Sequence, residues 1–344
     1  MKFIRTILFP FSIIYGWIMN LRNNQFDSGQ RRQTKFDRPV ISVGNLSVGG
    51  TGKTPMIEYL IRLFKDDYQL ATISRGYGRK TKGFKRASAE DDAATIGDEP
   101  YQFYKKFGDE MVVSVCEERI LAIPSLLLDD DSLNLFLLDD AYQHRQMGRD
   151  FNIMLSDFNE PFYKDFVLPT GNLREPRKGA SRADAIIITK CPMHLEDIDK
   201  DNIKNSVRIY NSTSPIYFSS IKYLPIRPVF NAAKAEKEIG LLTGVAKAGI
   251  IADYLSANHH IKEHLEYPDH YRFRANDLSD IGKKMKEKDV RSLVTTEKDM
   301  VRLLPFKDHP VFSSIDLYYL PIAFEIDRKE EFQEQLMKVV EKVN

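Results

Sequence analysis

Short apolar runs alternate with stretches of helical spacing through the first two-thirds of the chain. The runs are almost continuously apolar, and helical patterns such as residues 56–64 and 119–128 separate them. Apolar strands joined by helices are typical of a parallel sheet that is covered on both faces. The pattern therefore predicts an α/β fold with parallel strands at residues 39–43, 69–74, 111–115, 133–138, 151–155 and 185–189.

A second, smaller α/β unit follows. Strand patterns at 239–243, 261–266 and 291–295 alternate with helical patterns at 249–256 and 276–288, and Asn276 is the expected cap of the latter. The last helix is expected to begin at Asp327, because Glu330 completes a capping box and the apolar positions that follow form one stripe.

Residues 215–230 join the two units. This segment alternates and contains three prolines, which favours a linking pair of strands over a central place in a sheet. The expected organisation is an N-terminal segment, a larger domain, linker strands and a smaller domain with the C-terminal helix, at residues 1–36, 37–214, 215–230 and 231–344.

The N-terminal segment contains an almost wholly apolar run at residues 7–19, flanked by basic residues. As a helix it would reach only about 20 Å, short of the hydrocarbon core of a bilayer. No small-residue cleavage site follows it, which disfavours a signal peptide. Tyr15, Trp17 and the flanking arginines indicate a helix at a membrane interface. The alternative is an ordinary N-terminal helix packed on the body of the protein.

Composition narrows the class of protein. A length of 344 residues predicts about two domains, and 42% apolar residues indicate a globular chain with an ample core. The net charge of +1 gives no support to a nucleic-acid partner. Cys116 and Cys191 lie far apart, so we expect two buried thiols in a reducing compartment.

A glycine-rich loop follows the first strand, in the run SVGNLSVGGTGKTP at residues 42–55. Glycines between a buried strand and a helix N-terminus let backbone N–H groups surround phosphate oxygens. Lys53 would reach the β- and γ-phosphates and Thr54 would bind Mg²⁺, although Ser47 stands where this loop usually begins with glycine. We expect a P-loop NTPase-type α/β/α sandwich, with nucleotide held by Ser47, Val48, Gly49, Gly50, Thr51, Gly52, Lys53 and Thr54.

Two carboxylates, Asp139 and Asp140, end the strand predicted at 133–138. In a P-loop protein this is the place of the acid that holds Mg²⁺ or its waters, although adjacent acids also occur in ordinary turns. The run Thr189–Pro192 nearly matches a guanine-reading element, but proline replaces the aspartate that accepts from the base. A GTPase is therefore disfavoured.

Several polar loops have both a structural and a chemical interpretation. Taken alone, Asp98 in GDEP would be a helix cap, and the basic loops SRGYGR and GNLREP would be solvated turns. Their places after strands also suit ligand binding in a parallel sheet. The pair Asp269-His270 and the run TTEKD, which ends at Asp299, lie at strand ends of the second unit.

Eight ordered motifs together resemble the tetraacyldisaccharide 4′-kinases: SVGNLSVGGTGKTP, SRGYGR, GDEP, DDAYQH, GNLREP, TGVAKAG, YPDHY and TTEKD. The family's loop also lacks the first glycine, but Ala141 stands where the family usually has glycine. The resemblance implies an ATP- and Mg²⁺-dependent kinase for the 4′-hydroxyl of the lipid A disaccharide 1-phosphate. It also implies a monomer at the cytoplasmic face of the bacterial inner membrane, with no nucleic-acid partner.

The resemblance also implies a role for each residue that matches a position of a family motif. It implies Lys53 at the phosphates, Asp98 as the general base, His270 as the partner of that base, and Thr54, Asp139, Asp140 and Glu175 around Mg²⁺. The residues matching the remaining motif positions are expected to meet the acceptor: Arg75, Tyr77, Arg79, Gln143, His144, Asn172 and Arg174. Two rivals remain open, namely a membrane-associated ATP-driven switch and a P-loop kinase for a soluble metabolite.

Overall fold

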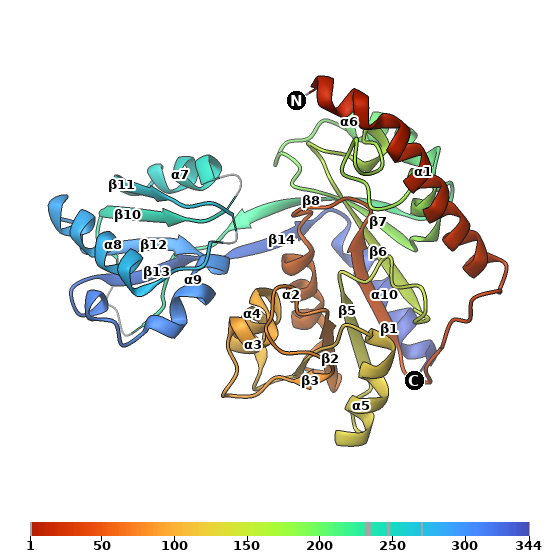
Figure 1. Cartoon of the computed structure of the whole chain (residues 1–344), viewed down its shortest axis with the longest axis horizontal. Coiled ribbons are helices and arrows are strands. Elements are labelled where there is room, and N and C mark those ends of the chain that lie inside the picture. The colour runs from red at the N-terminus through yellow and green to blue at the C-terminus, as the bar shows by residue number, and fades with distance from the viewer. Residues whose placement is uncertain (1, 231–234, 246–247, 270, 344) are drawn as a thin grey trace.

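The computed structural model describes residues 2–230, 235–245, 248–269 and 271–343. Two sheets lie side by side, joined by two strands, as Figure 1 shows. The larger has nine strands in the order β14-β8-β7-β6-β1-β5-β2-β4-β3, and the smaller has five in the order β11-β10-β12-β13-β9. This arrangement confirms the expected α/β class.

Parallel pairing dominates the large sheet. Its consecutive parallel strands are β8 (Ile216–Tyr223), β7 (Ala185–Thr189), β6 (Phe151–Asp157), β1 (Val40–Asn45), β5 (Leu135–Asp139), β2 (Leu70–Ser74) and β4 (Val112–Val115). Only the outermost strands, β3 (Lys85–Arg86) and β14 (Ile322–Ile326), pair antiparallel. Because β1, β2, β5, β6 and β7 are buried throughout, their sequences are mostly apolar and lack a regular alternation of polar and apolar residues.

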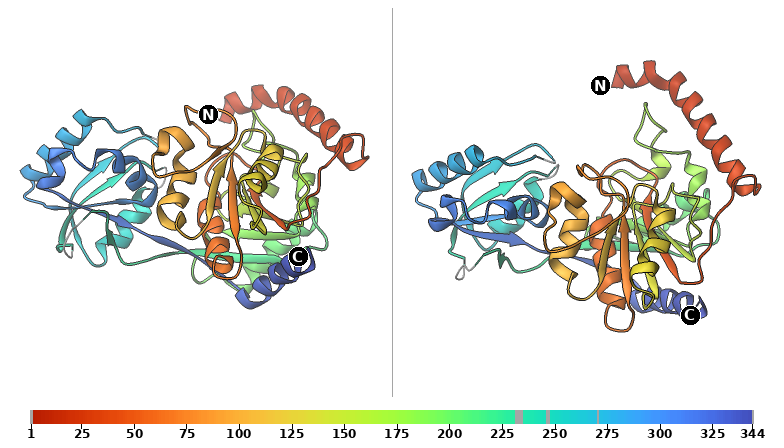
Figure 2. Two further views of the ribbon diagram at one scale, coloured as in Figure 1. Left: turned by 90° about the horizontal axis from the view of Figure 1, so that it is seen from below. Right: turned by 60° about the horizontal axis from the view of Figure 1, so that its bottom comes forward.

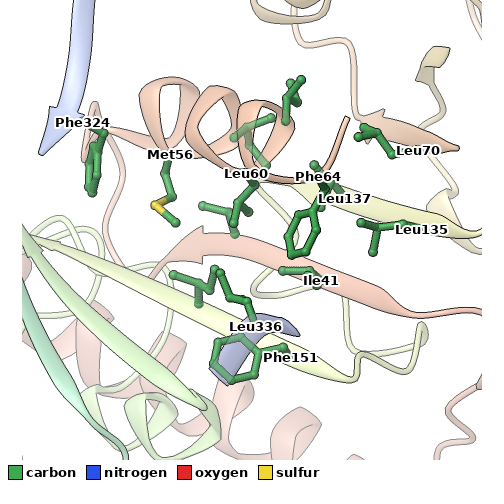
Figure 3. Close-up of a cluster of buried hydrophobic side chains, with 14 of the residues drawn as sticks. Ile41, Met56, Leu60, Phe64, Leu70, Leu135, Leu137, Phe151, Phe324 and Leu336 are labelled. Atoms are coloured by element: carbon green, nitrogen blue, oxygen red, sulfur yellow. The ribbon is translucent and has the colours of Figure 1, made fainter. Parts of the chain in front are cut away.

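The helix α2 (Lys53–Phe64) packs its apolar stripe over the centre of this sheet. Met56, Leu60 and Phe64 point toward strand residues such as Ile41 and Leu137 in Figure 3. The other helices of this unit are α1 (Lys2–Asp27), α3 (Ala93–Ile96), α4 (Asp98–Phe107), α5 (Ala122–Asp129) and α6 (Asp197–Arg208), with short 3₁₀ turns at Arg119–Leu121, Phe162–Lys164 and Arg177–Arg182.

The C-terminal helix α10 (Lys329–Val343) lies on the large sheet, whereas the sequence interpretation assigned it to the second unit. Its stripe of Phe332, Leu336 and Val340 is fully buried in the same cluster as Ile41. Burial of each such side chain is worth about 1.5–3 kcal/mol. The helix begins at Lys329, not Asp327, because the Asp327 carboxylate instead accepts a hydrogen bond from the Phe218 N–H of β8.

The small sheet consists of β11 (His260–Glu266), β10 (Glu238–Thr243), β12 (Ser292–Thr296), β13 (Asp316–Leu320) and β9 (Arg227–Pro228). Its helices are α7 (Ala248–Ser256), α8 (Ala275–Glu287) and α9 (Glu297–Leu303), with 3₁₀ turns at Leu304–Phe306 and Pro310–Ser313. Asn276 lies inside α8, so its assignment as the cap is wrong. Residue Arg274 precedes the helix, and its N–H donates to Asp277.

The connection between the sheets is made by β8 and β14. They pair antiparallel, and Figure 1 shows them running from one unit to the other. The expectation of a linking strand pair at 215–230 differs from this in two respects. The strand β8 also belongs to the large sheet, and its partner is a strand about a hundred residues later, from Ile322 to Ile326.

Candidate active site

The glycine loop lies between the end of β1 and the start of α2. Gly49 and Gly52 have φ of 104° and 89°, a conformation that side-chain-bearing residues rarely adopt. Ser47 is outside this region of φ and instead forms an antiparallel bridge with Leu173. A serine therefore fits where the usual loop has its first glycine. Beyond the loop, Thr189 donates to the Thr51 carbonyl at 2.9 Å and Lys190 donates to the Gly50 carbonyl.

The Lys53 ammonium group lies at the carboxyl edge of the sheet. Its Nζ is 3.3 Å from Asn45 Oδ1 and 3.6 Å from Asp140 Oδ1. Thr54 follows in the first turn of α2, and the parallel pairing of β1 with β5 sets Val43 opposite Asp139. The loop, the lysine and the acid pair are thus held together by sheet register.

The two adjacent carboxylates differ in their surroundings. Asp139 is buried at the end of β5, and burial together with Asp140 raises its pKa to about 7. Burial would also raise the pKa of Asp140, but Lys53 and Arg174 outweigh this and hold it below its usual value. Arg174 Nη1 donates to both Asp140 oxygens, at 2.9 and 3.0 Å. Arg119 supports the turn from behind by donating to the Asp139 and Asp140 carbonyls.

The turn after these carboxylates shows how alanine fits at position 141, where the family resemblance led us to expect glycine. The left-handed residue is Asp140, with φ of 46°, while Ala141 is outside that region and fully buried. The methyl group of Ala141 packs in the apolar cluster that contains Ile73 and Leu138. A side chain is therefore accepted at position 141 without backbone strain.

Glu175, expected at the metal, is buried and accepts hydrogen bonds from three side chains. Its oxygens accept from Asn23 at 2.8 Å, Gln143 at 2.9 Å and Arg182 at 2.8 Å. Gln143 also donates to the Asn45 carbonyl at 2.9 Å, so its amide connects Glu175 to the glycine loop. Through these hydrogen bonds, Glu175 and Gln143 stabilise the arrangement of the site.

Oxygen donors suited to Mg²⁺ remain at this edge. Thr54 offers a hydroxyl and Asp139 a carboxylate, the ligand types that Mg²⁺ prefers beside substrate phosphates. Within the described residues, no three His, Cys, Asp or Glu side chains gather closely enough to hold a metal ion. The donor set therefore fits an ion shared with a nucleotide rather than an all-protein cage.

His144 lies in basic surroundings. Burial, and then the charges of Arg119, Arg149, Arg22 and Arg75, lower its pKa to about 4. The imidazole is therefore neutral near pH 7 and adds no positive charge for an anionic acceptor.

The residues of the SRGYGR loop divide into two groups. Arg75 and Tyr77 are exposed, with Tyr77 at 79%. The Arg79 side chain is only 2% exposed, and its guanidinium binds Glu117 at 2.7 Å. Arg79 thus stabilises the loop, while Arg75 and Tyr77 are exposed to solvent. From the second unit, Arg272 donates to the Gly78 carbonyl at 2.9 Å.

Asp98 opens α4, which faces the second unit. Gly97 precedes the helix as its cap, so the interpretation of Asp98 as the cap is wrong. Asp98 Oδ2 accepts from Arg302 Nε at 2.9 Å and Nη2 at 2.7 Å. His270, the expected partner, lies outside the described residues. Sequence reasoning missed Arg302, and its only local signal is its place three residues after Asp299 on α9.

The GNLREP loop lies between the glycine loop and α1. The Val48 N–H donates to the Asn172 carbonyl at 2.7 Å, and the Arg174 N–H donates to the Leu46 carbonyl at 2.7 Å. On its other side, Tyr15 of α1 donates to the Arg174 carbonyl at 3.0 Å. Asn172 thus acts here through its backbone, and Arg174 connects α1 to the acid pair.

The helix α1 lies along one edge of the molecule in Figure 2, and many of its apolar side chains are exposed. Trp17 is 62% exposed, and the same outward exposure is shared by Ile7, Phe9, Phe11, Ile13, Ile14, Ile18 and Leu21. A surface helix of a globular protein normally does the reverse. Among the residues that the structure describes, no helix is long and apolar enough to cross a membrane.

A glycine loop between a central parallel strand and a helix N-terminus, with a carboxylate ending the adjacent strand, defines a P-loop α/β protein. A sequence profile of the tetraacyldisaccharide-1-P 4′-kinases matches residues 4–341. Proteins named tetraacyldisaccharide 4′-kinase are similar over 99% of this chain and 98% of their own, with 42% identity in Flavobacterium psychrophilum and 43% in Flavobacterium johnsoniae.

A solved structure agrees with these sequence relatives. The LpxK protein of Aquifex aeolicus, crystallised in complex with ATP, superposes with a TM-score of 0.77 and 30% identity, over 98% of this chain and 99% of that one. The chain therefore belongs to the tetraacyldisaccharide-1-P 4′-kinase family and is a phosphotransferase.

Proposed function

We propose that the protein transfers the γ-phosphate of ATP to the 4′-hydroxyl of the tetraacyldisaccharide 1-phosphate precursor of lipid A. The observation that carries this proposal is the position of Lys53, between Asn45 and Asp140 at the N-terminus of α2. There its ammonium group can meet phosphates that the loop N–H groups hold. Family membership supplies the acceptor class.

Mg²⁺ fits this site through Thr54 and Asp139. When bound, the ion neutralises charge that develops on the transferring phosphoryl group. Asp140 has a different task, because it is engaged by Arg174 and lies near Lys53. It orients these two cations at the edge where the phosphates bind.

Asp98 is the proposed general base. A carboxylate within hydrogen-bond reach of a sugar hydroxyl accelerates transfer by about 10²–10⁴-fold. Its side chain is 25% exposed at the start of α4, so a hydroxyl can approach it. His270 is proposed as its partner on the strength of the YPDHY motif alone.

The acceptor carries acyl chains, and we assign α1 to the membrane surface. Its outward apolar face supports insertion into the interface, and Arg31, Arg32 and Lys35 beyond it suit anionic headgroups. The proposed location is the cytoplasmic face of the inner membrane, where ATP is available, and the proposed state is a monomer. Arg75 and Tyr77 are the proposed contacts to the acceptor.

Transfer of label from [γ-³²P]ATP to detergent-dispersed lipid A disaccharide 1-phosphate tests the function. Wild type is expected to label the lipid, K53A to lose labelling, and D98A to lose it while retaining nucleotide binding. ATP hydrolysis without labelled lipid would favour an ATP-driven switch. Labelling of a water-soluble sugar in preference to the lipid would favour a kinase for soluble metabolites.

A further inference from the structure

Two helices from different units, α4 and α9, lie side by side where the units meet (Figure 1). Asp98 at the start of α4 binds Arg302 near the end of α9. Lys106 near the end of α4 binds Glu297 at the start of α9, at 2.6 Å. The helices are therefore antiparallel and are held at both ends by ion pairs.

The Asp98 pair has an unusually fixed geometry. Both Nε and Nη2 of Arg302 donate to the same oxygen, Asp98 Oδ2. The remaining nitrogen, Nη1, donates to Asp299 at 2.9 Å. The guanidinium is thus held in its plane between two carboxylates, with its side chain only 5% exposed.

Asp299 is in turn fixed by the second sheet. It is fully buried, and its Oδ2 accepts from the Gly244 N–H at 2.8 Å and from the Thr296 hydroxyl at 2.7 Å. Gly244 follows β10 and Thr296 ends β12. These contacts bring the motifs TGVAKAG, TTEKD and GDEP into one hydrogen-bonded chain that ends at Asp98.

We infer that Arg302 is a positioning residue, which fixes the carboxylate of Asp98 relative to the carboxyl ends of β10 and β12. This inference rests on the proposed role of Asp98 as the base. Arg302 does not itself reach the reacting atoms through this contact; it sets the plane of the carboxylate that does. The second unit thereby orients a catalytic group that the first unit carries.

The competing explanation is that Arg302 merely holds the two units together. Lys106 offers a matched comparison, because its Nζ lies 2.6 Å from both Glu58 of α2 and Glu297 of α9. Burial, and then the charge of Glu58, raises the pKa of Glu297. The E297Q substitution removes the charge that pairs with Lys106. It therefore weakens the contact between α4 and α9 without removing a contact of Asp98.

The test measures kcat, and KM for ATP and for the lipid acceptor, in wild type, R302M, R302K and E297Q. Misplacing a catalytic group costs about 10–100-fold, so R302M is expected to lower kcat by that factor while both KM values change by less than about threefold. R302K should recover part of kcat, and E297Q should keep kcat within about threefold of wild type.

A double-mutant cycle distinguishes a positioning role of Arg302 from a purely structural role. If Arg302 acts through Asp98, R302M lowers kcat no further in a D98N background. Equal losses in R302M and E297Q, additive losses in D98N/R302M, or a kcat that rises in R302M would each overturn the inference. Full activity in D98N would instead overturn the assignment of the base. Should R302M fail to fold by thermal melting, the same cycle is run with R302K.

Discussion

The Ser12 hydroxyl donates a hydrogen bond of 2.7 Å to the Thr170 hydroxyl, and the Thr170 N–H donates back to Ser12 at 3.0 Å. This reciprocal contact is buried beneath α1, on the face opposite its exposed apolar side chains. Polar contacts therefore help to attach this face of the helix to the body of the protein, while many apolar side chains on its other face are exposed.

The first prediction concerns that apolar face. Burying each large apolar side chain is worth about 1.5–3 kcal/mol, so I13E/W17E should weaken binding to anionic phospholipid vesicles by about 100-fold. Vesicle co-sedimentation measures this effect. The matched control is I198E, because Ile198 is 66% exposed on α6, a different helix. Unchanged sedimentation of I13E/W17E would show that α1 does not insert.

The second prediction separates two arginines of one loop. R79A should lower the free energy of unfolding by about 1–3 kcal/mol, because Glu117 loses its buried partner. R75A should change that free energy by less than about 0.5 kcal/mol, because Arg75 is exposed. Loss of one charged contact to the acceptor in R75A should raise KM for the lipid about tenfold. Urea denaturation and steady-state kinetics measure the two quantities. An R75A enzyme with unchanged KM would remove Arg75 from the acceptor site.

The third prediction is a pH dependence of stability. The pKa of His144 is about 4 in the folded protein, against 6.5 for an ordinary histidine, so the unfolded chain binds more protons between these values. Stability from this group is therefore present above pH 6.5 and is lost as pH falls toward 4. At pH 5 this group is expected to lower the free energy of unfolding by about 1 kcal/mol, a value that is reduced to allow for the partial exposure of His144.

Comparison of H144N with wild type by urea denaturation at pH 7 and pH 5 isolates this contribution. The variant should lose less stability on acidification than wild type does. H260N is the control, because His260 is a largely exposed imidazole on β11. Equal pH slopes in H144N and wild type would contradict the prediction.

The fourth prediction concerns Ala141, in the turn after the two carboxylates. Because Ala141 needs no left-handed backbone and its methyl is buried, A141G should lower the free energy of unfolding by about 1 kcal/mol. Its kcat should match that of wild type. A variant more stable than wild type would show that the turn strains the alanine.

The local sequence pattern was sufficient to locate most strands of the large sheet and the glycine loop. The apolar runs located β1, β2, β4, β5, β6 and β7 to within about two residues, because strands buried on both faces are mostly apolar. The loop was found from its glycines between a strand and a helix, and the acid pair from its place at the end of a later strand. Cys116 and Cys191 are buried free thiols, as their strand contexts indicated.

The same patterns did not show which distant partners a residue meets. Glu175 was expected at the metal from its motif, and the motif did not indicate that its oxygens accept from Asn23, Gln143 and Arg182. Arg79 shares a motif with Arg75, yet it is buried against Glu117. Sequence spacing indicates which residues are near a site, but it does not indicate which of them donate to one another.

The sequence by itself determined the α/β class, the phosphate loop and the apolar N-terminal helix, because each depends on interactions within one segment. Only the tertiary structure decided that α10 covers the large sheet and that Arg302 meets Asp98, 204 residues earlier. An apolar stripe requires burial but does not specify the surface that buries it. Likewise, an arginine requires an acceptor, and packing of the two units selects which carboxylate comes within reach.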